Sequence, residues 1–445
     1  MIVIENVTVA TVDANDTVHT DGHVVVGDDG RIAAVGPGKT EMSGKRVDGK
    51  GHLVTPGLVN SHHHLYQWAT RGLALDETLF GWLTTLYPIW GRLDADVTGA
   101  AAAAGLGWLA LSGCTTSMDH HYVFPRDGGD VLEAEIEAAR RIGLRFHPTR
   151  GSMDLSRKDG GLPPDHVVEE TDEALAATEA AIDRWHDPSP GSMLRIAVAP
   201  CSPFSVTTRL MEEAAVLARR KGVRLHTHLA ETDDEEQFCL ERFGCTPVEY
   251  ADRVGWLGED VWLAHGVHFS DKEIARLGAT RTGVAHCPSS NARLGAGMAR
   301  VRELVDAGVP VGLGVDGAAS QEVSQISAEL RQALYTARLR GGPTAMTALE
   351  ALRLGTMGGA RCLGREDDIG SLEVGKLADL VMWRLDGLGH DGVDDKVAAL
   401  VFGPTAPVEL ALVGGDPVVE RGELVNADEE TLAREARRVH RKLMV

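Results

Sequence analysis

Short apolar runs separated by turn residues occupy both ends of the chain. Val24–Val26 precede Asp28-Asp29-Gly30, and Ile32–Val35 follow. Asp-Gly between two β-rich runs predicts a hairpin. Towards the other end, 378–383 has the composition of a strand, and 410–419 that of a second hairpin. The pattern predicts one small β-sandwich domain that is built from both termini, residues 1–55 and 362–445.

The middle of the chain alternates between apolar β-type runs and amphipathic helical patterns, such as those at 131–142, 175–185 and 209–221. Eight such alternations predict a closed (β/α)₈ barrel of the TIM type over residues 56–361, in an α/β protein. An open doubly wound sheet is the competing prediction. It is disfavoured as a dinucleotide-binding fold, because no Gly-x-Gly-x-x-Gly follows the first strand. The eight β-type runs lie near 53–60, 115–119, 143–149, 194–201, 223–229, 261–266, 283–287 and 309–316.

Composition and charge narrow the class of protein. The chain has 445 residues, 43% of them hydrophobic, which is enough for a large core. Its net charge of −21 disfavours nucleic acid and anionic lipid as partners. Residues 97–118 carry no charge, but Ala, Gly, Ser and Thr dominate them, which favours a packed helix running into a buried strand over a membrane span. Six cysteines without a Cys-x-x-Cys pair, and an N-terminus unlike a secretory signal, predict a cytoplasmic protein.

Histidines stand where the first barrel strand is predicted to end. The sequence there is Asn60-Ser61-His62-His63-His64. Side chains at i and i+2 share a face of an extended chain, so His62 and His64 point together and His63 points away. Two imidazoles on one face suit an ion such as zinc.

Further polar side chains occur at other predicted strand ends. His228 ends the fifth strand with Glu231 just beyond it, His265 ends the sixth, and Asp316 lies at the end of the eighth. Barrel strands present their carboxyl ends at one rim, where active sites lie. Four imidazoles and two carboxylates are therefore expected around one site. His226 lies two residues before His228, one layer deeper, and is interpreted as core packing.

Several strings along the chain carry a family resemblance. They are Pro-Gly-Leu-Val-Asn-Ser-His-His-His at 56–64, His-Thr-His-Leu-Ala-Glu at 226–231, Leu-Ala-His at 263–265, His-Cys-Pro-Ser-Ser-Asn at 286–291, Gly-Val-Asp-Gly at 314–317 and Ile-Gly-Ser-Leu-Glu-Val-Gly-Lys-Leu-Ala-Asp at 369–379. Because these strings occur in this order, the chain resembles the amidohydrolase superfamily over essentially its whole length. Within the superfamily it is similar to the deaminase and chlorohydrolase branch. Strings such as Arg-Gly-Ser-Met at 150–153 and Ala-Pro-Cys-Ser-Pro-Phe at 199–204 are most similar to 8-oxoguanine deaminases. Hydroxytriazine and chlorotriazine hydrolases are close relatives.

The resemblance implies a metal centre and a set of catalytic groups. One divalent metal ion would be held by His62, His64, His228 and Asp316. The fourth strand ends Ala-Pro-Cys at 199–201 without a lysine, which favours a single ion. Zinc is expected, with ferrous iron as the alternative. Asp316 would also accept the proton of the attacking water, Glu231 would pass protons to the ring and to the leaving amine, and His265 would stabilise the developing oxyanion.

The predicted reaction is hydrolytic deamination of an amino-substituted nitrogen heterocycle, with 8-oxoguanine, converted to urate and ammonia, as the leading substrate. The alternatives are an s-triazine or pterin aminohydrolase, and a non-catalytic binding protein, which the intact set of ligands disfavours. Gln67 suits a purine edge and Arg150 an oxo group. Trp82 and Trp90 offer stacking faces, although both are interpreted as structural. The partner is a small heterocyclic molecule, and a homo-oligomer is expected.

One departure from the 8-oxoguanine branch concerns selectivity. Gln321 and Glu322 stand where that branch usually has Asn and Asp. Both side chains are longer by a methylene. They are expected at the rim, where they either face the substrate or support the loop.

Overall fold

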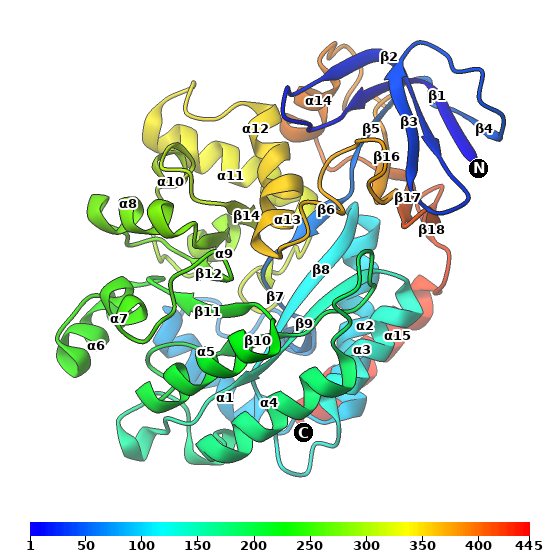
Figure 1. Ribbon diagram of the computed structural model, residues 1–445. Coiled ribbons are helices and arrows are strands. Elements are labelled where there is room, and N and C mark those ends of the chain that lie inside the picture. The colour runs from blue at the N-terminus through cyan, green and yellow to red at the C-terminus, as the bar shows by residue number, and fades with distance from the viewer.

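A computed structural model describes all residues, 1–445. Its centre is a closed barrel of eight parallel strands (Figure 1). The barrel closes where β14 pairs with β6, through Leu313 and Asn60. The predicted fold class is confirmed. Around the barrel the strands follow the order β6 (Leu58–Asn60), β8 (Cys114–His121), β9 (Arg145–Ser152), β10 (Ala197–Pro200), β11 (Leu225–Leu229), β12 (Val261–His265), β13 (Gly283–His286) and β14 (Val311–Leu313).

Helices between the strands cover the outside of the barrel, and local sequence sets their ends. Asp94 caps the start of α2, and Gly143 ends α3 in the left-handed region. Ser270 and Glu273 form a capping box at α8. The helices are α1 (Leu79–Trp90), α2 (Ala95–Leu111), α3 (Val131–Ile142), α4 (Thr171–Trp185), α5 (Thr208–Lys221), α6 (Asp233–Phe243), α7 (Pro247–Arg253), α8 (Asp271–Thr280), α9 (Pro288–Arg293), α10 (Val301–Asp306), α11 (Ile326–Gly341), α12 (Ala348–Arg353) and α13 (Gly359–Cys362).

The uncharged stretch at 97–118 is a packed helix and a buried strand, as predicted. It forms most of α2 and the first part of β8, whose residues are all buried. No helix combines the length and the hydrophobicity that crossing a bilayer requires.

Both ends of the chain contribute to one mixed sheet of nine strands, in the upper right of Figure 1. β5 joins the two ends, since it pairs in parallel with β1 and antiparallel with β16. Side chains such as Ile4, Val24 and Leu412 form a separate buried cluster there. The strands are β1 (Ile2–Ala10), β2 (Val18–Val26), β3 (Ile32–Pro37), β4 (Lys45–Asp48), β5 (His52–Pro56), β16 (Leu380–Arg384), β17 (Val408–Val413), β18 (Asp416–Glu420) and β19 (Glu423–Leu424).

Two details differ from the predicted elements. The run 53–60 is two strands, β5 in the terminal sheet and β6 in the barrel. They meet at Gly57, where any Cβ would collide with Thr115. Residues 429–444, assigned to the β part, form helix α15 (Glu429–Met444), which lies along α2 and carries Arg438, 2.6 Å from Asp96. The domain boundaries at 55/56 and 361/362 stay a prediction.

Candidate active site and metal centre

A short two-stranded sheet at the barrel rim brings the first histidines next to the aspartate. β7 (His63–His64) pairs in parallel with β15 (Asp316–Gly317). Oδ1 of Asp316 thereby lies 3.4 Å from Nε2 of His62 and 3.3 Å from Nε2 of His64. Asp316 adopts a φ of 60°, in the left-handed region that non-glycine residues avoid. Such backbone strain clusters at functional sites.

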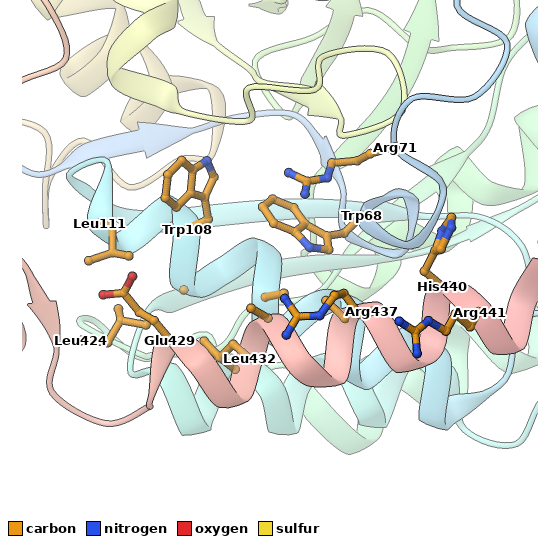
Figure 2. Close-up of a pocket in the computed structure, with 14 residues that line it drawn as sticks. Trp68, Arg71, Trp108, Leu111, Leu424, Glu429, Leu432, Arg437, His440 and Arg441 are labelled. Carbon is orange, nitrogen blue, oxygen red and sulfur yellow. The ribbon is translucent and has the colours of Figure 1, made fainter.

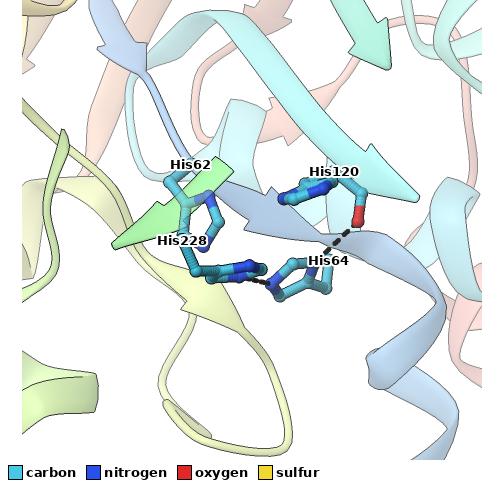
Figure 3. Close-up of side chains that lie close together, drawn as sticks. All are labelled: His62, His64, His120 and His228. Atoms are coloured by element: carbon cyan, nitrogen blue, oxygen red, sulfur yellow. Dashed lines mark hydrogen bonds between the residues drawn. The ribbon is translucent and has the colours of Figure 1, made fainter. Parts of the chain in front are cut away.

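His228 joins this group from β11. Its Nε2 lies 3.1 Å from Nε2 of His64 (Figure 3). The ligating atoms of His62, His64, His228 and the neighbouring His120 all lie within 4.8 Å of one another, and every ring is buried. These rings form a buried candidate metal site.

In His64 and in His228, a hydrogen bond at Nδ1 fixes the tautomer of the ring. Nδ1 of His64 donates to the carbonyl of His120, and Nδ1 of His228 to that of Cys201, both at 2.7 Å. A carbonyl only accepts, so each Nδ1 carries the proton and each Nε2 keeps its lone pair. The Nε2 atoms of both rings therefore suit metal coordination.

In His62, too, Nδ1 carries the proton and Nε2 keeps its lone pair, and here the hydrogen-bond acceptor is another histidine. Nδ1 of His226 donates to the carbonyl of Trp262 at 2.8 Å, so Nε2 of His226 is an acceptor. That atom lies 2.8 Å from Nδ1 of His62, which must donate to it. His226 is therefore more than core packing: it orients His62 and leaves the Nε2 lone pair of His62 free.

The charges of the group suit a divalent cation. Burial lowers the pKa of His62 and His228 well below the ordinary value, so these rings are neutral at pH 7. Asp316 accepts hydrogen bonds from Ser290 Oγ at 2.5 Å and Ser320 Oγ at 3.1 Å, which favour its carboxylate form. Three imidazole nitrogens and one carboxylate suit zinc or ferrous iron.

Glu231 and His265 lie together beside the candidate ligands. Oε2 of Glu231 is 3.5 Å from Nε2 of His265, and Oε1 of Glu231 is buried without a partner. Burial, and then the charges of Asp316 and Glu235, raise the pKa of Glu231 well above the ordinary value. Glu231 is thus a carboxyl group that can hold a proton to donate. Nδ1 of His265 is held by Oδ1 of Asn291 at 2.9 Å, which fixes the ring.

A cavity of about 30 Å³ lies over these groups. Four of its fourteen lining residues come from α1. Gln67 faces it with an amide whose nitrogen and oxygen are buried without partners. Gly317 makes room for that amide, because a Cβ there would collide with it. The cavity is lined by His64, Gln67, Leu79, Trp82, Leu83, Tyr87, Tyr122, Cys201, Phe204, His228, Glu231, His265, Leu294 and Asp316.

Arg150, predicted to contact substrate, is not among the residues that line the cavity. Its guanidinium makes a bidentate pair with Glu169, at 2.6 and 2.7 Å, and lies over the Phe124 ring. A nearby carboxylate therefore decides where this long side chain points.

Gln321 and Glu322 do not reach the cavity either. Nε2 of Gln321 donates to Glu329 at 2.6 Å, and Glu322 pairs with Arg293 at 3.2 Å. Of the two expectations for these residues, loop support fits the structure.

The walls that α1 provides were mostly missed from the sequence. Leu79, Leu83 and Tyr87 follow one another at intervals of four, which places them on one helix face, but such a stripe is equally typical of core packing. Trp82 lines the cavity, and its Nε1 donates to the carbonyl of Ala319 at 3.1 Å. Trp90 is fully buried outside the cavity, with Nε1 on Thr70 Oγ1, as a structural residue would be.

A larger cavity lies elsewhere, between α2, α15 and η1 (Leu65–Thr70). It measures about 560 Å³ and exposes Trp68, Trp108, Arg71 and Arg437 (Figure 2). It contains no cluster of metal-ligating groups. Size alone therefore does not mark the candidate active site, whereas the converging donor atoms do.

Comparison with known proteins identifies the family. The amidohydrolase family profile matches residues 53–418. The chain belongs to the amidohydrolase family. The predictions of the family, and of a hydrolase acting on C–N bonds, are confirmed.

Among the relatives of this chain, an 8-oxoguanine deaminase from Pseudomonas aeruginosa is 48% identical over 399 residues, 88% of each chain. A hydroxydechloroatrazine ethylaminohydrolase from Pseudomonas sp. is 38% identical and covers 93% of this chain and 87% of its own. The crystal structure of an atrazine chlorohydrolase from Arthrobacter aurescens, complexed with zinc, superposes with a TM-score of 0.94 at 35% identity, covering 99% of this chain and 100% of its own.

Proposed function

We propose that this amidohydrolase is a zinc-dependent deaminase that converts 8-oxoguanine and water to urate and ammonia. The observation that carries the proposal is the convergence of three Nε2 lone pairs and one carboxylate beside the buried carboxyl group of Glu231, whose pKa is raised. Zinc would be held by His62, His64, His228 and Asp316. The 48% identity to an 8-oxoguanine deaminase supports this choice of substrate.

A bound zinc ion supplies the acidity that turns water into a nucleophile near pH 7. The protein provides the proton transfers. Asp316 accepts the proton of the water, and Glu231 donates its own proton to the ring nitrogen beside the amino-bearing carbon. His265, oriented by Asn291, stabilises negative charge on the oxygen that adds to this carbon. Glu231 then takes the proton of the hydroxyl that was added and passes it to the amino group, so that the C–N bond breaks, ammonia leaves and the C=O bond forms. The proton held by Asp316 restores Glu231.

Substrate recognition rests on Gln67 and on movement of α1. The amide of Gln67 presents a donor and an acceptor without protein partners, which matches the edge of an oxopurine. The cavity of about 30 Å³ leaves too little open space for a purine. The apolar wall that α1 provides would therefore shift to admit the ring and then cover it.

A pterin or s-triazine is the second candidate substrate. An isoxanthopterin deaminase and the ethylaminohydrolase described above are each 38% identical to this chain. Both ring types carry an amidine-like edge, to which Gln67 and Glu231 can form hydrogen bonds. A homo-oligomer in the cytoplasm is part of the same proposal.

An ammonia-release screen tests the function. Purified protein with measured metal content is offered oxopurines, pterins and aminotriazines. We expect about one zinc per chain and the highest kcat/KM for 8-oxoguanine, with urate as the product. A higher kcat/KM for a pterin or a triazine would replace the substrate, and a zinc-loaded protein that released ammonia from none of them would contradict the deaminase proposal.

A further inference from the structure

The end of the barrel opposite the candidate active site holds a second polar cavity, of about 240 Å³. We call it the floor cavity. It lies where β9, β10 and β11 begin, and Leu363 and Gly364 close one side. No acidic residue lines it. Its polar side chains are all basic: His147, His186, Arg195 and Arg224.

Four arginines gather around the floor cavity, and only one of them forms a close salt bridge. Arg145 is paired with Asp379 at 2.9 Å. Arg195 has only a long pair, 3.8 Å from Asp368. Arg224 and Arg365 have no carboxylate oxygen within 4.0 Å; Nε of Arg224 donates to the carbonyl of Cys362, and Nη2 of Arg365 to that of Ser192. Carboxylates such as Glu366, Asp260 and Asp368 attract these arginines from a longer distance, so what the cavity lacks is a carboxylate in direct contact, not negative charge nearby.

Several of these basic groups are buried without hydrogen-bond partners. Arg365 is 2% exposed, yet its Nε and Nη1 have none. The same holds for Nε of Arg195 and for Nδ1 of His147, a ring that lines the cavity and is 1% exposed. Burying an unpaired cation is costly, and buried polar groups in native proteins nearly always have a partner.

The protonation states leave these groups as hydrogen-bond donors. Burial, and then Arg195 and Arg145, lower the pKa of Arg365 to about 9, so its guanidinium stays charged at pH 7. Burial, and then the surrounding guanidiniums, lower the pKa of His147 well below the ordinary value, so this ring is neutral with one N–H. The floor cavity thus offers charged N–H groups and no acidic side chain.

We propose that the floor cavity binds a phosphate group, as inorganic phosphate or as the phosphate of a monoester. Guanidinium groups bind phosphate oxygens through charge-assisted, often bidentate hydrogen bonds. Arg195 and Arg224 line it beside the starts of β10 and β11, and His147, whose Nδ1 has no partner, lines the same cavity. Arg365 adds positive charge nearby. The volume of the cavity leaves room for the organic part of a monoester.

The bound group lies at the foot of a packed column inside the barrel. The ring of His147 is 6.0 Å from that of Trp262, which stacks on His226 at 4.4 Å. His226 in turn orients His62 at the rim. The site is therefore separate from the catalytic pocket, although the same barrel interior connects the two.

Titration calorimetry and thermal melting of the full chain test this site, with sodium phosphate against sodium chloride of equal ionic strength. We expect one phosphate per chain and a rise in Tm of about 3–5 °C at saturation. Arg195→Gln should weaken binding about tenfold or more. The control, Arg209→Gln, removes an exposed arginine of α5 that pairs with Asp172 and Glu213, and binding should stay within about twofold.

Two further measurements locate the site and the source of the phosphate. The His228→Ala variant, altered at the rim, should bind phosphate as the wild type does. A loss of phosphate binding in this variant would assign the phosphate to the catalytic centre instead.

A nucleoside 5′-monophosphate that binds more tightly than inorganic phosphate would identify a monoester as the ligand, and weaker binding would identify the free ion.

Arg224→Gln is the second floor variant, for the case that Arg195→Gln does not fold. Circular dichroism checks the fold of both. The site is refuted if phosphate stabilises the protein no more than chloride does, or if folded Arg195→Gln and Arg224→Gln bind phosphate like the wild type.

Discussion

The two ends of the barrel bury basic side chains in opposite ways. At the rim, His62, His64 and His228 present lone pairs, and at the floor Arg195 and Arg365 present N–H groups. Burial lowers the pKa of His62 and His228 and also that of Arg365. A histidine starts near 6.5 and becomes neutral, whereas Arg365 falls only to about 9 and stays charged. The same burial therefore makes one end suited to a cation and the other to an anion.

The two ends also differ in how their nitrogens are held. At the rim, the protein fills one nitrogen of each ring with a fixed acceptor and leaves the other nitrogen facing its neighbours. At the floor, the guanidiniums are held through some of their N–H groups by backbone carbonyls, such as those of Ser192 and Gly364, while others are unpaired. The rim therefore depends on fixed tautomers, whereas the floor keeps spare N–H donors, and the following variants test the rim.

The largest effect is expected for His228→Ala. Removing one Nε2 ligand should abolish zinc binding and ammonia release together, while the fold persists, because a catalytic metal site sits on a finished scaffold. Metal analysis, activity and circular dichroism measure this. His186→Asn at the floor is the matched control, since its amide oxygen can still accept from Ile196 N–H, and zinc and activity should be retained. Stoichiometric zinc in His228→Ala would remove His228 from the ligand set.

Glu231→Gln should separate the proton shuttle from the metal centre. The amide keeps the size of the side chain but cannot transfer a proton. We expect kcat to fall by about 10²–10⁴-fold with unchanged zinc content. If zinc were lost together with activity, Glu231 would be a ligand and the proposed mechanism would fail.

His226→Leu tests how the rim holds its tautomers. Without an acceptor for Nδ1, His62 can turn or change tautomer, and zinc affinity should fall by about 10–100-fold. Competition with a chelator measures it. His226→Gln restores an acceptor near the same place and should recover most of the affinity. Equal zinc affinities in both variants and in the wild type would show that His226 only packs in the core.

Gln67→Met tests recognition without touching the metal. Methionine keeps the length of the side chain but leaves the edge of the ring without its partners. We expect kcat/KM for 8-oxoguanine to fall about ten- to a hundredfold at constant zinc content, as for a lost buried hydrogen bond of about 1–3 kcal/mol. Unchanged kcat/KM for every substrate in the screen would place recognition elsewhere.

The smallest effect on substrate choice is expected for the double variant Gln321→Asn with Glu322→Asp. Gln321 is paired with Glu329 and Glu322 with Arg293, away from the cavity. The ratio of kcat/KM between an oxopurine and a pterin should not change, while the free energy of unfolding should fall by about 1 kcal/mol through weakened hydrogen bonds. A changed ratio would show that this loop reaches the substrate.

The sequence by itself determined the barrel, the terminal sheet and the groups at the rim. Strand periodicity places His62 and His64 on one face, and a parallel barrel must bring the ends of its strands together. Short side chains at strand ends have little freedom, so the sequence alone predicts that His228, His265 and Asp316 lie at the rim.

Only the tertiary structure decided where long side chains point and which distant groups they meet. Arg150 turns to Glu169, and His226 meets His62 across the barrel. The arginines of the floor cavity come from strand starts and a turn far apart in the chain, with no local pattern to join them. A long, flexible side chain takes the direction that its partners allow, and those partners exist only once the chain has folded.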